Sequence, residues 1–167
     1  MARRKSRPKS PARPRKRAKT SPRRAASIAA RARAVANDPV ALALERIKFD
    51  RQGLVPAIAQ QFDTGEVLML AWMSRAAVEE SLRSGKVTYW SRSRAKLWRK
   101  GESSGQEQRL VELRVDCDGD TLLLLVDQVG VACHTGRRAC FFTALRGGKL
   151  EEILPVTVDP KELYGER

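Results

Sequence analysis

Three cysteines, three aspartates and the only histidine of this 167-residue chain lie close together in its second half. The cysteines are Cys117, Cys133 and Cys140, the aspartates are Asp116, Asp118 and Asp120, and the histidine is His134. Thiolates suit a borderline-soft cation such as zinc, whereas carboxylates suit a hard cation such as magnesium. Two ligand sets of opposite preference in one short segment predict a catalytic site that holds two metal ions.

The aspartates alternate along the chain, so in an extended segment Asp116, Asp118 and Asp120 would share one face. Cys117 would then point to the other face. Three carboxylates on one face repel one another unless a divalent cation lies between them, which predicts a magnesium site. The alternatives are an acidic turn or a calcium loop. An EF-hand loop is disfavoured because its twelfth position is Asp127, within an apolar run, rather than Glu.

The three cysteines match the ligand number of a catalytic zinc site, which keeps three protein ligands and leaves one position open. Such a site generates hydroxide near neutral pH, which suits attack on an electron-poor ring carbon such as C6 of a purine. The alternative is that one or more cysteines are ordinary small buried side chains. His134 could be a fourth ligand, a base, or a group that orients the aspartate-bound metal.

Residues 92–106 (RSRAKLWRKGESSGQ) are polar and basic and contain glycine, which predicts a long loop. Mixed arginine, lysine and serine side chains suit phosphate oxygens, so this stretch indicates a phosphorylated substrate. Arg137 and Arg138 stand beside the cysteines as well. The alternative is a solvated basic loop.

The elements that must position these residues are predicted to form a β-rich α+β domain with largely antiparallel sheets and a few short helices. Capping residues predict helices over 40–47, after Asn37-Asp38-Pro39, and over 75–83, between Ser74 and Gly85. Apolar patterns predict strands over 54–61, 67–72, 86–91, 107–117, 121–128 and 140–145. The first two strands should form a hairpin, the strand over 121–128 should be buried on both sides, and Gly147-Gly148 should form a turn. Within 107–117, alternation places on one face Val111, Leu113, Val115 and Cys117.

Charge divides the chain in two. The net charge is +14, but residues 1–36 hold fourteen Lys and Arg and no acidic residue, while residues 37–167 hold nineteen of each sign. Residues 1–36 are therefore predicted to be a disordered basic extension, and residues 37–167 the folded domain. The extension could bind nucleic acid, act as an organellar transit peptide, or be merely solvated.

Several classes of protein are excluded by composition. No apolar run approaches the roughly 18 residues that a membrane span needs, and no apolar segment follows the basic start as in a signal peptide. An odd number of cysteines argues against a disulfide framework and favours a reducing compartment.

Four segments together resemble the phosphoribosyl-AMP cyclohydrolase family of histidine biosynthesis. They are Leu68–Met73 (LMLAWM), Trp90–Gly105 (WSRSRAKLWRKGESSG), Val115–Asp120 (VDCDGD) and Ala132–Phe141 (ACHTGRRACF), within a resemblance that covers about residues 46–146. The resemblance implies hydrolysis of the purine N1–C6 bond of 1-(5-phosphoribosyl)-AMP to the opened formimino-carboxamide ribonucleotide. It also implies a cytoplasmic homodimer with intertwined sheets, one zinc per site, and a requirement for magnesium.

The resemblance assigns roles by position. Cys117, Cys133 and Cys140 would bind zinc, with Cys117 supplied by the opposite subunit. Asp116, Asp118 and Asp120 would bind magnesium, and His134 would be a general base or lie beside the metal. Substrate binding would involve Ser91, Arg92, Ser93, Arg94, Trp98, Lys100, Glu102, Ser104, Gly105 and Arg137. Ala139 stands where the family often has serine, and the basic extension has no counterpart. The chain ends before the fused domain that some members carry, so a separate phosphoribosyl-ATP pyrophosphohydrolase is the expected functional partner.

A zinc-stabilised nucleic-acid-binding module is the alternative function. It would explain the charge and the cysteines, but it leaves the three aspartates unexplained, and these repel nucleic acid. Paired C-x2-C spacing is also missing.

Overall fold

The computed structural model of this chain describes residues 38–165. Contacts along the chain divide it into residues 1–36 and 37–167, so everything described here belongs to the second unit. The predicted disorder of residues 1–36 lies outside the described residues.

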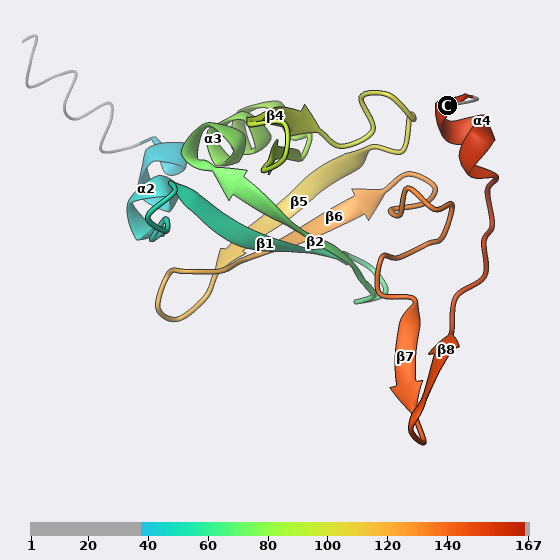
Figure 1. Cartoon of the computed structure of the whole chain (residues 1–167). Coiled ribbons are helices and arrows are strands. Elements are labelled where there is room, and N and C mark those ends of the chain that lie inside the picture. The colour runs from blue at the N-terminus through green and yellow to red at the C-terminus, as the bar shows by residue number, and fades with distance from the viewer. Residues whose placement is uncertain (1–37, 166–167) are drawn as a thin grey trace, which may run out of the picture. The chain divides into compact units, whose positions relative to one another are not determined.

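The described residues form three helices and eight strands (Figure 1). The helices are α2 (Pro39–Arg46), α3 (Arg75–Ser84) and α4 (Pro160–Tyr164). The strands are β1 (Leu54–Gln61), β2 (Val67–Ser74), β3 (Thr88–Ser91), β4 (Lys96–Arg99), β5 (Gln108–Val115), β6 (Leu122–Gln128), β7 (Thr143–Arg146) and β8 (Lys149–Glu152). The predicted α+β class with mostly antiparallel strands is confirmed. No helix among these residues is long and apolar enough to cross a membrane.

Six strands make one sheet in the order β4-β3-β2-β1-β6-β5. Its neighbours are antiparallel except β1 and β6, which are parallel. The sheet curls, because the segment before β3 also bonds to the edge strand β5. Val87 N donates to the carbonyl of Gln108 over 3.0 Å, and Leu110 N donates to that of Gly85 over 2.8 Å. Strands β7 and β8 form a separate hairpin that extends away from this sheet (Figure 1).

Helices α2 and α3 begin where their capping residues predict, and α3 also ends at its predicted glycine. The carboxylate of Asp38 accepts from Val40 N over 3.0 Å at the start of α2, and Ser74 Oγ accepts from Ala77 N over 3.2 Å at the start of α3. Gly85 ends α3 with a φ of +70°, a conformation that only glycine adopts without strain.

The core lies where α2 and α3 cover the central strands. Its fully buried members include Val55 and Ala57 of β1, Leu68 and Met73 of β2, Val78 of α3, Tyr89 of β3, and Leu122, Leu124 and Val126 of β6. Each large apolar side chain buried in this way contributes about 1.5–3 kcal/mol to folding. The parallel pair of β1 and β6 therefore carries much of the buried core of the sheet.

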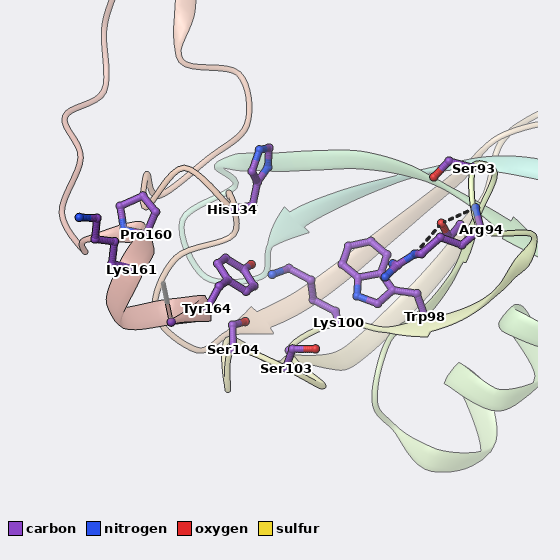
Figure 2. Close-up of a pocket in the computed structure, with 13 residues that line it drawn as sticks. Ser93, Arg94, Trp98, Lys100, Ser103, Ser104, His134, Pro160, Lys161 and Tyr164 are labelled. Carbon is purple, nitrogen blue, oxygen red and sulfur yellow. Dashed lines mark hydrogen bonds between the residues drawn. The ribbon is translucent and has the colours of Figure 1, made fainter. Parts of the chain in front are cut away.

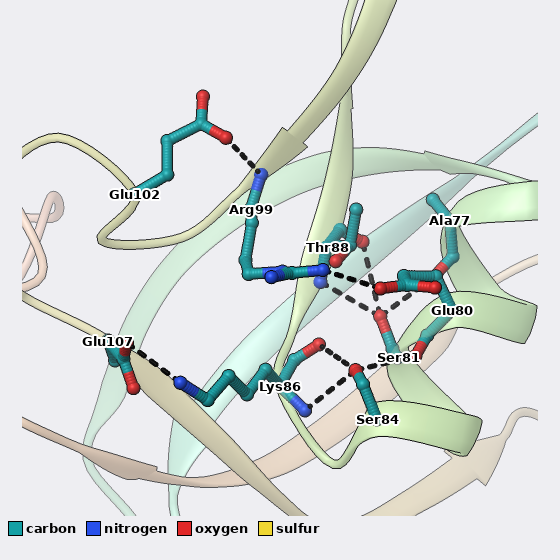
Figure 3. Close-up of polar contacts among 9 residues, drawn as sticks. All are labelled: Ala77, Glu80, Ser81, Ser84, Lys86, Thr88, Arg99, Glu102 and Glu107. Atoms are coloured by element: carbon teal, nitrogen blue, oxygen red, sulfur yellow. Dashed lines mark hydrogen bonds and ion pairs between the residues drawn. The ribbon is translucent and has the colours of Figure 1, made fainter.

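Polar contacts fasten α3 to the strands beside it (Figure 3). The buried Ser81 Oγ donates to the carbonyl of Ala77 over 2.7 Å and accepts from Thr88 N over 2.8 Å. Arg99 of β4 pairs with Glu80 over 2.6 Å. That ion pair is exposed and contributes only about 0–1 kcal/mol, so the buried serine is the stronger tie.

The predicted loop over 92–106 is wrong in part, because it contains β4. Ala95 has a φ of +47°, which turns the chain back so that residues 96–99 pair with β3. The turn also brings the Trp98 ring within 5.6 Å of the Tyr89 ring, between centroids. This aromatic contact therefore helps to hold β4 against β3, although the polar composition of residues 92–106 predicted no strand there.

Other boundaries also differ from the predictions. A bulge between Leu110 and Glu112 reverses the alternation of β5, so Val111 is exposed instead of facing inward with Leu113. Only one face of β6 is fully buried, because its alternate residues are half-buried. Strand β3 is shorter than predicted, β7 begins at Thr143 rather than Cys140, and the sequence pattern missed α4 altogether.

Candidate active site

The three aspartates lie in the turn between β5 and β6. The predicted extended conformation is wrong, because β5 ends at Val115 and the turn is held by Asp116, whose Oδ1 accepts from Gly119 N over 2.9 Å and from Thr121 N over 3.1 Å. Gly119 has a φ of +86°, and a Cβ there would collide with the carbonyl of Arg46. The turn still gathers Asp116, Asp118 and Asp120, whose carboxylate oxygens lie within 4.8 Å of one another.

This carboxylate cluster fits a hard divalent cation. The hydrogen bond with Asp116 and the charges of Asp120 and Asp116 raise the pKa of Asp118. Desolvation opposes ionisation of Asp116, but backbone N–H groups led by that of Thr121, together with its aspartate neighbours, lower its pKa. An all-oxygen set of this kind is the donor set that magnesium prefers.

Cys133 and Cys140 lie close together in the segment between β6 and β7. Cys140 N donates to the carbonyl of Leu68 over 2.7 Å, and Cys133 Sγ lies 3.1 Å from Thr135 Oγ1. The pKa of the Cys140 thiol is raised to about 12, mainly because its sulfur is desolvated and also because Cys133 lies beside it and shares a hydrogen bond with it. The charge of Lys100 opposes this shift. Two adjacent thiols are suitable zinc ligands.

Within one chain, Cys117 does not lie close to Cys133 and Cys140. It is exposed in the aspartate turn, and the described residues contain no group of three close His, Cys, Asp or Glu ligand atoms besides the three aspartates. One chain therefore supplies two of the three predicted thiolates together.

A cavity of about 740 Å³ is lined by residues that include His134 and Lys100 (Figure 2). His134, the neighbour of Cys133, is exposed on its wall. Lys100 also lines it but is only 4% exposed, and its Nζ donates to the carbonyl of Gln106 over 3.3 Å. Burial lowers the pKa of Lys100 below its ordinary value, and the charges of Cys140 and Cys133 oppose this shift without reversing it.

The cavity brings together six of the ten predicted substrate-binding residues. These are Ser91, Ser93, Arg94, Trp98, Lys100 and Ser104. The other four lie outside its lining. Arg92 lies over the ring of Trp72, Glu102 accepts from Arg99 N, Gly105 N donates to the carbonyl of Gly101, and Arg137 faces the C-terminal segment.

Arg138 clamps the segment that carries the cysteines. Its guanidinium donates to the carbonyl of Gly130 over 2.7 Å, to Gln61 Oε1 over 3.0 Å and to Glu66 Oε2 over 3.1 Å. A planar guanidinium can serve three acceptors at once, which a lysine cannot do in the same geometry. This positioning role was not predicted, although the residue stood beside the cysteines in the sequence.

Buried and half-buried glutamines support the same segment. Gln128 Nε2 donates to the carbonyl of Val129 over 2.6 Å, and Gln106 Oε1 accepts from Val131 N over 2.8 Å. Gln108 links Tyr89 to Gln128 through bonds of 2.7 and 2.8 Å. Sequence reasoning missed this network. The available signal was Gln128, a glutamine at the end of the mostly apolar strand β6.

Comparison with known proteins identifies the family of this chain. A model of the phosphoribosyl-AMP cyclohydrolase family matches residues 69–142, which include all the predicted metal ligands. A phosphoribosyl-AMP cyclohydrolase of Rhodospirillum centenum is 68% identical over 120 residues, covering 72% of this chain and 90% of the relative. One from Alkalilimnicola ehrlichii is 66% identical over 121 residues, covering 72% and 85%, and one from Paramagnetospirillum magneticum is 64% identical over 124 residues, covering 74% and 94%. This chain therefore belongs to the phosphoribosyl-AMP cyclohydrolase family.

Proposed function

We propose that this chain hydrolyses the N1–C6 bond of 1-(5-phosphoribosyl)-AMP in histidine biosynthesis. The observation that carries the proposal is the cavity that joins His134, next to the paired cysteines, to the basic and serine-rich wall formed by β3, β4 and the loop after β4. In the reaction, the oxygen of a water adds to C6, the C6–N1 bond breaks, and N1 takes up a proton. C6 becomes a carboxamide carbon that keeps its amino group.

The chain's own residues would bind the substrate and move the protons. Ser91, Ser93 and Arg94 offer donors to the sugar–phosphate portion from one side of the cavity, and Ser103 and Ser104 offer them from the loop after β4. His134 also lines the cavity, and it can take a proton from the attacking water and return it to N1.

The metal ligands would be those of the two clusters. Cys133 and Cys140 would hold zinc together with Cys117 of a second copy, and the three aspartates would hold magnesium. Bound zinc supplies Lewis acidity that lowers the pKa of water to near neutrality.

A homodimer is part of the proposal, because a third thiolate is not gathered within one chain. The exposed apolar side chains of the β7–β8 hairpin support it, since Leu145 is 72% and Leu150 is 74% exposed. Cytoplasmic location and a separate pyrophosphohydrolase partner remain predictions.

The proposal is tested by turnover of phosphoribosyl-AMP, followed by ultraviolet absorbance, in purified protein with zinc and magnesium and after chelation. Cys133→Ser, Cys140→Ser and Asp118→Asn should each lower kcat at least 100-fold, which corresponds to about 2.7 kcal/mol. The two cysteine variants should also lose zinc in metal analysis. Asp127→Asn, which only removes an exposed ion pair with Arg109, is the control and should keep normal activity. Full turnover by a metal-free sample would contradict the metal assignment.

A further inference from the structure

The wall of the cavity that faces β4 comes from the C-terminal segment. Pro160, Lys161, Tyr164 and Gly165 of this segment line the cavity together with His134. None of the four lies in the motifs that identify the family, and residues 143–165 lie beyond the matched range of 69–142. The catalytic motifs therefore do not complete the pocket on their own.

The segment is fastened to the turn that carries His134. The carbonyl of Gly136 accepts from Thr157 N over 2.8 Å and from Val158 N over 3.2 Å. Arg137 donates through Nε to the carbonyl of Leu154 over 3.1 Å and pairs with Glu152 over 2.6 Å. These bonds fix the C-terminal segment against the two residues that follow Thr135.

Glycine is required at this junction. Gly136 has a φ of +76°, and a Cβ there would collide with the carbonyl of Val158. The close backbone approach therefore depends on the residue type as well as on the hydrogen bonds.

Helix α4 presents one side to the cavity. Asp159 caps it by accepting from Lys161 N over 2.9 Å, and Leu163 is buried at 8% exposure, which seats the helix. Pro160 and Tyr164 are four residues apart and so share one side. Glu162 is exposed and does not line the cavity.

Tyr164 is the member of α4 that points into the cavity. In Figure 2 its ring points from the helix towards the ammonium group of Lys100, below His134, whereas the Lys161 side chain points away. Trp98 lies on the other side of Lys100 in the same view. Two aromatic rings thus flank a cavity whose volume of about 740 Å³ is that of a small-molecule site.

We infer that Tyr164 is a substrate-contacting residue, and that the C-terminal segment from Ile153 to Gly165 is a built part of the nucleotide site. The ring packs against the nucleoside, and the hydroxyl donates to an oxygen of the sugar–phosphate. This inference rests on the proposed function for the identity of the nucleotide, and it assigns the segment to binding rather than to bond cleavage.

The test compares KM and kcat for phosphoribosyl-AMP, and the Kd of AMP by calorimetry, in four variants of the full chain. Tyr164→Ala should raise KM and the AMP Kd about tenfold, equal to about 1.4 kcal/mol, with a smaller change in kcat. Tyr164→Phe should fall between Tyr164→Ala and the wild type, because it keeps the ring. Leu163→Ala should raise KM and the AMP Kd as Tyr164→Ala does, because it removes the buried contact that holds α4 in place. Glu162→Ala, which changes an exposed side chain outside the cavity, should leave both values at those of the wild type.

The outcomes separate this inference from the proposed function. If the wild type turns over phosphoribosyl-AMP and Tyr164→Ala has the same KM and the same Kd for AMP as the wild type, the inference is overturned and the proposed function stands. No turnover, but AMP binding that Tyr164→Ala weakens, rejects the function and keeps the nucleotide site. Neither turnover nor AMP binding by the wild type rejects both.

Discussion

At the scale of single residues, the site depends on several side chains whose roles cannot be inferred from the residues next to them in the sequence. The ligand types could be predicted, because carboxylates and thiols carry their chemistry wherever they lie. The supporting residues could not, since a buried glutamine or a clamping arginine is defined by partners far along the chain. Arg138 is the clearest case, because its acceptors include Gln61 and Glu66, more than 70 residues away.

Replacing Arg138 by lysine should loosen the cysteine segment. Arg138→Lys keeps the charge but cannot hold all three acceptors, so we expect the free energy of unfolding in urea to fall by about 1–3 kcal/mol. Activity and zinc affinity should fall with it. Arg109→Lys, which alters an exposed pair at 3.4 Å, should change stability by less than about 0.5 kcal/mol. Equal effects of the two variants would show that Arg138 is no clamp.

At the scale of elements, local signals were the reliable ones. Strand β1 matches its predicted bounds, and α3 lies between the predicted caps, because alternation and capping are encoded within a few residues. The bulge in β5 depends on its pairing with β6, and α4 is too short to show a periodic pattern. Those features arise from tertiary contacts, which a local pattern does not contain.

The junction of Gly136 with the C-terminal segment gives a prediction at this scale. Gly136→Ala adds both a strained φ and a collision with Val158, whereas Gly147→Ala, at φ +54°, adds strain with nothing within 4 Å. We expect Gly147→Ala to cost about 1 kcal/mol of stability, and Gly136→Ala to cost more and to raise KM as well. Urea unfolding and steady-state kinetics measure the two effects. A normal KM in Gly136→Ala would mean that the segment does not have to dock there for substrate to bind.

At the scale of the whole molecule, we propose that the zinc site is shared between two copies, because one chain gathers only two of the three thiols. Cys117 is exposed in the aspartate turn, where a second copy could reach it. Among the described residues, the gathered aspartates give a nucleic-acid-binding function no support, because carboxylates repel phosphates.

Mixed dimers test the shared site. Cys117→Ser and Cys133→Ser chains, each inactive alone, should regain about a quarter of wild-type activity after equal mixing and reassembly, because half the dimers then carry one intact site of two. Mixing Cys133→Ser with Cys140→Ser is the control and should give no recovery, since both ligands come from one chain. Failure of the first mixture to recover, in samples that mass spectrometry shows to be mixed, would place all the ligands in one chain.

The most direct test of the account is the identity of the product formed from phosphoribosyl-AMP in ¹⁸O-labelled water. We expect one product that has gained a single labelled water, with the ¹⁸O in the new carboxamide and no ammonia released, because C6 adds water and only the bond to N1 breaks. Release of ammonia would mean that the exocyclic amino group leaves instead. That result, or no turnover with zinc and magnesium both supplied, would contradict the proposed reaction.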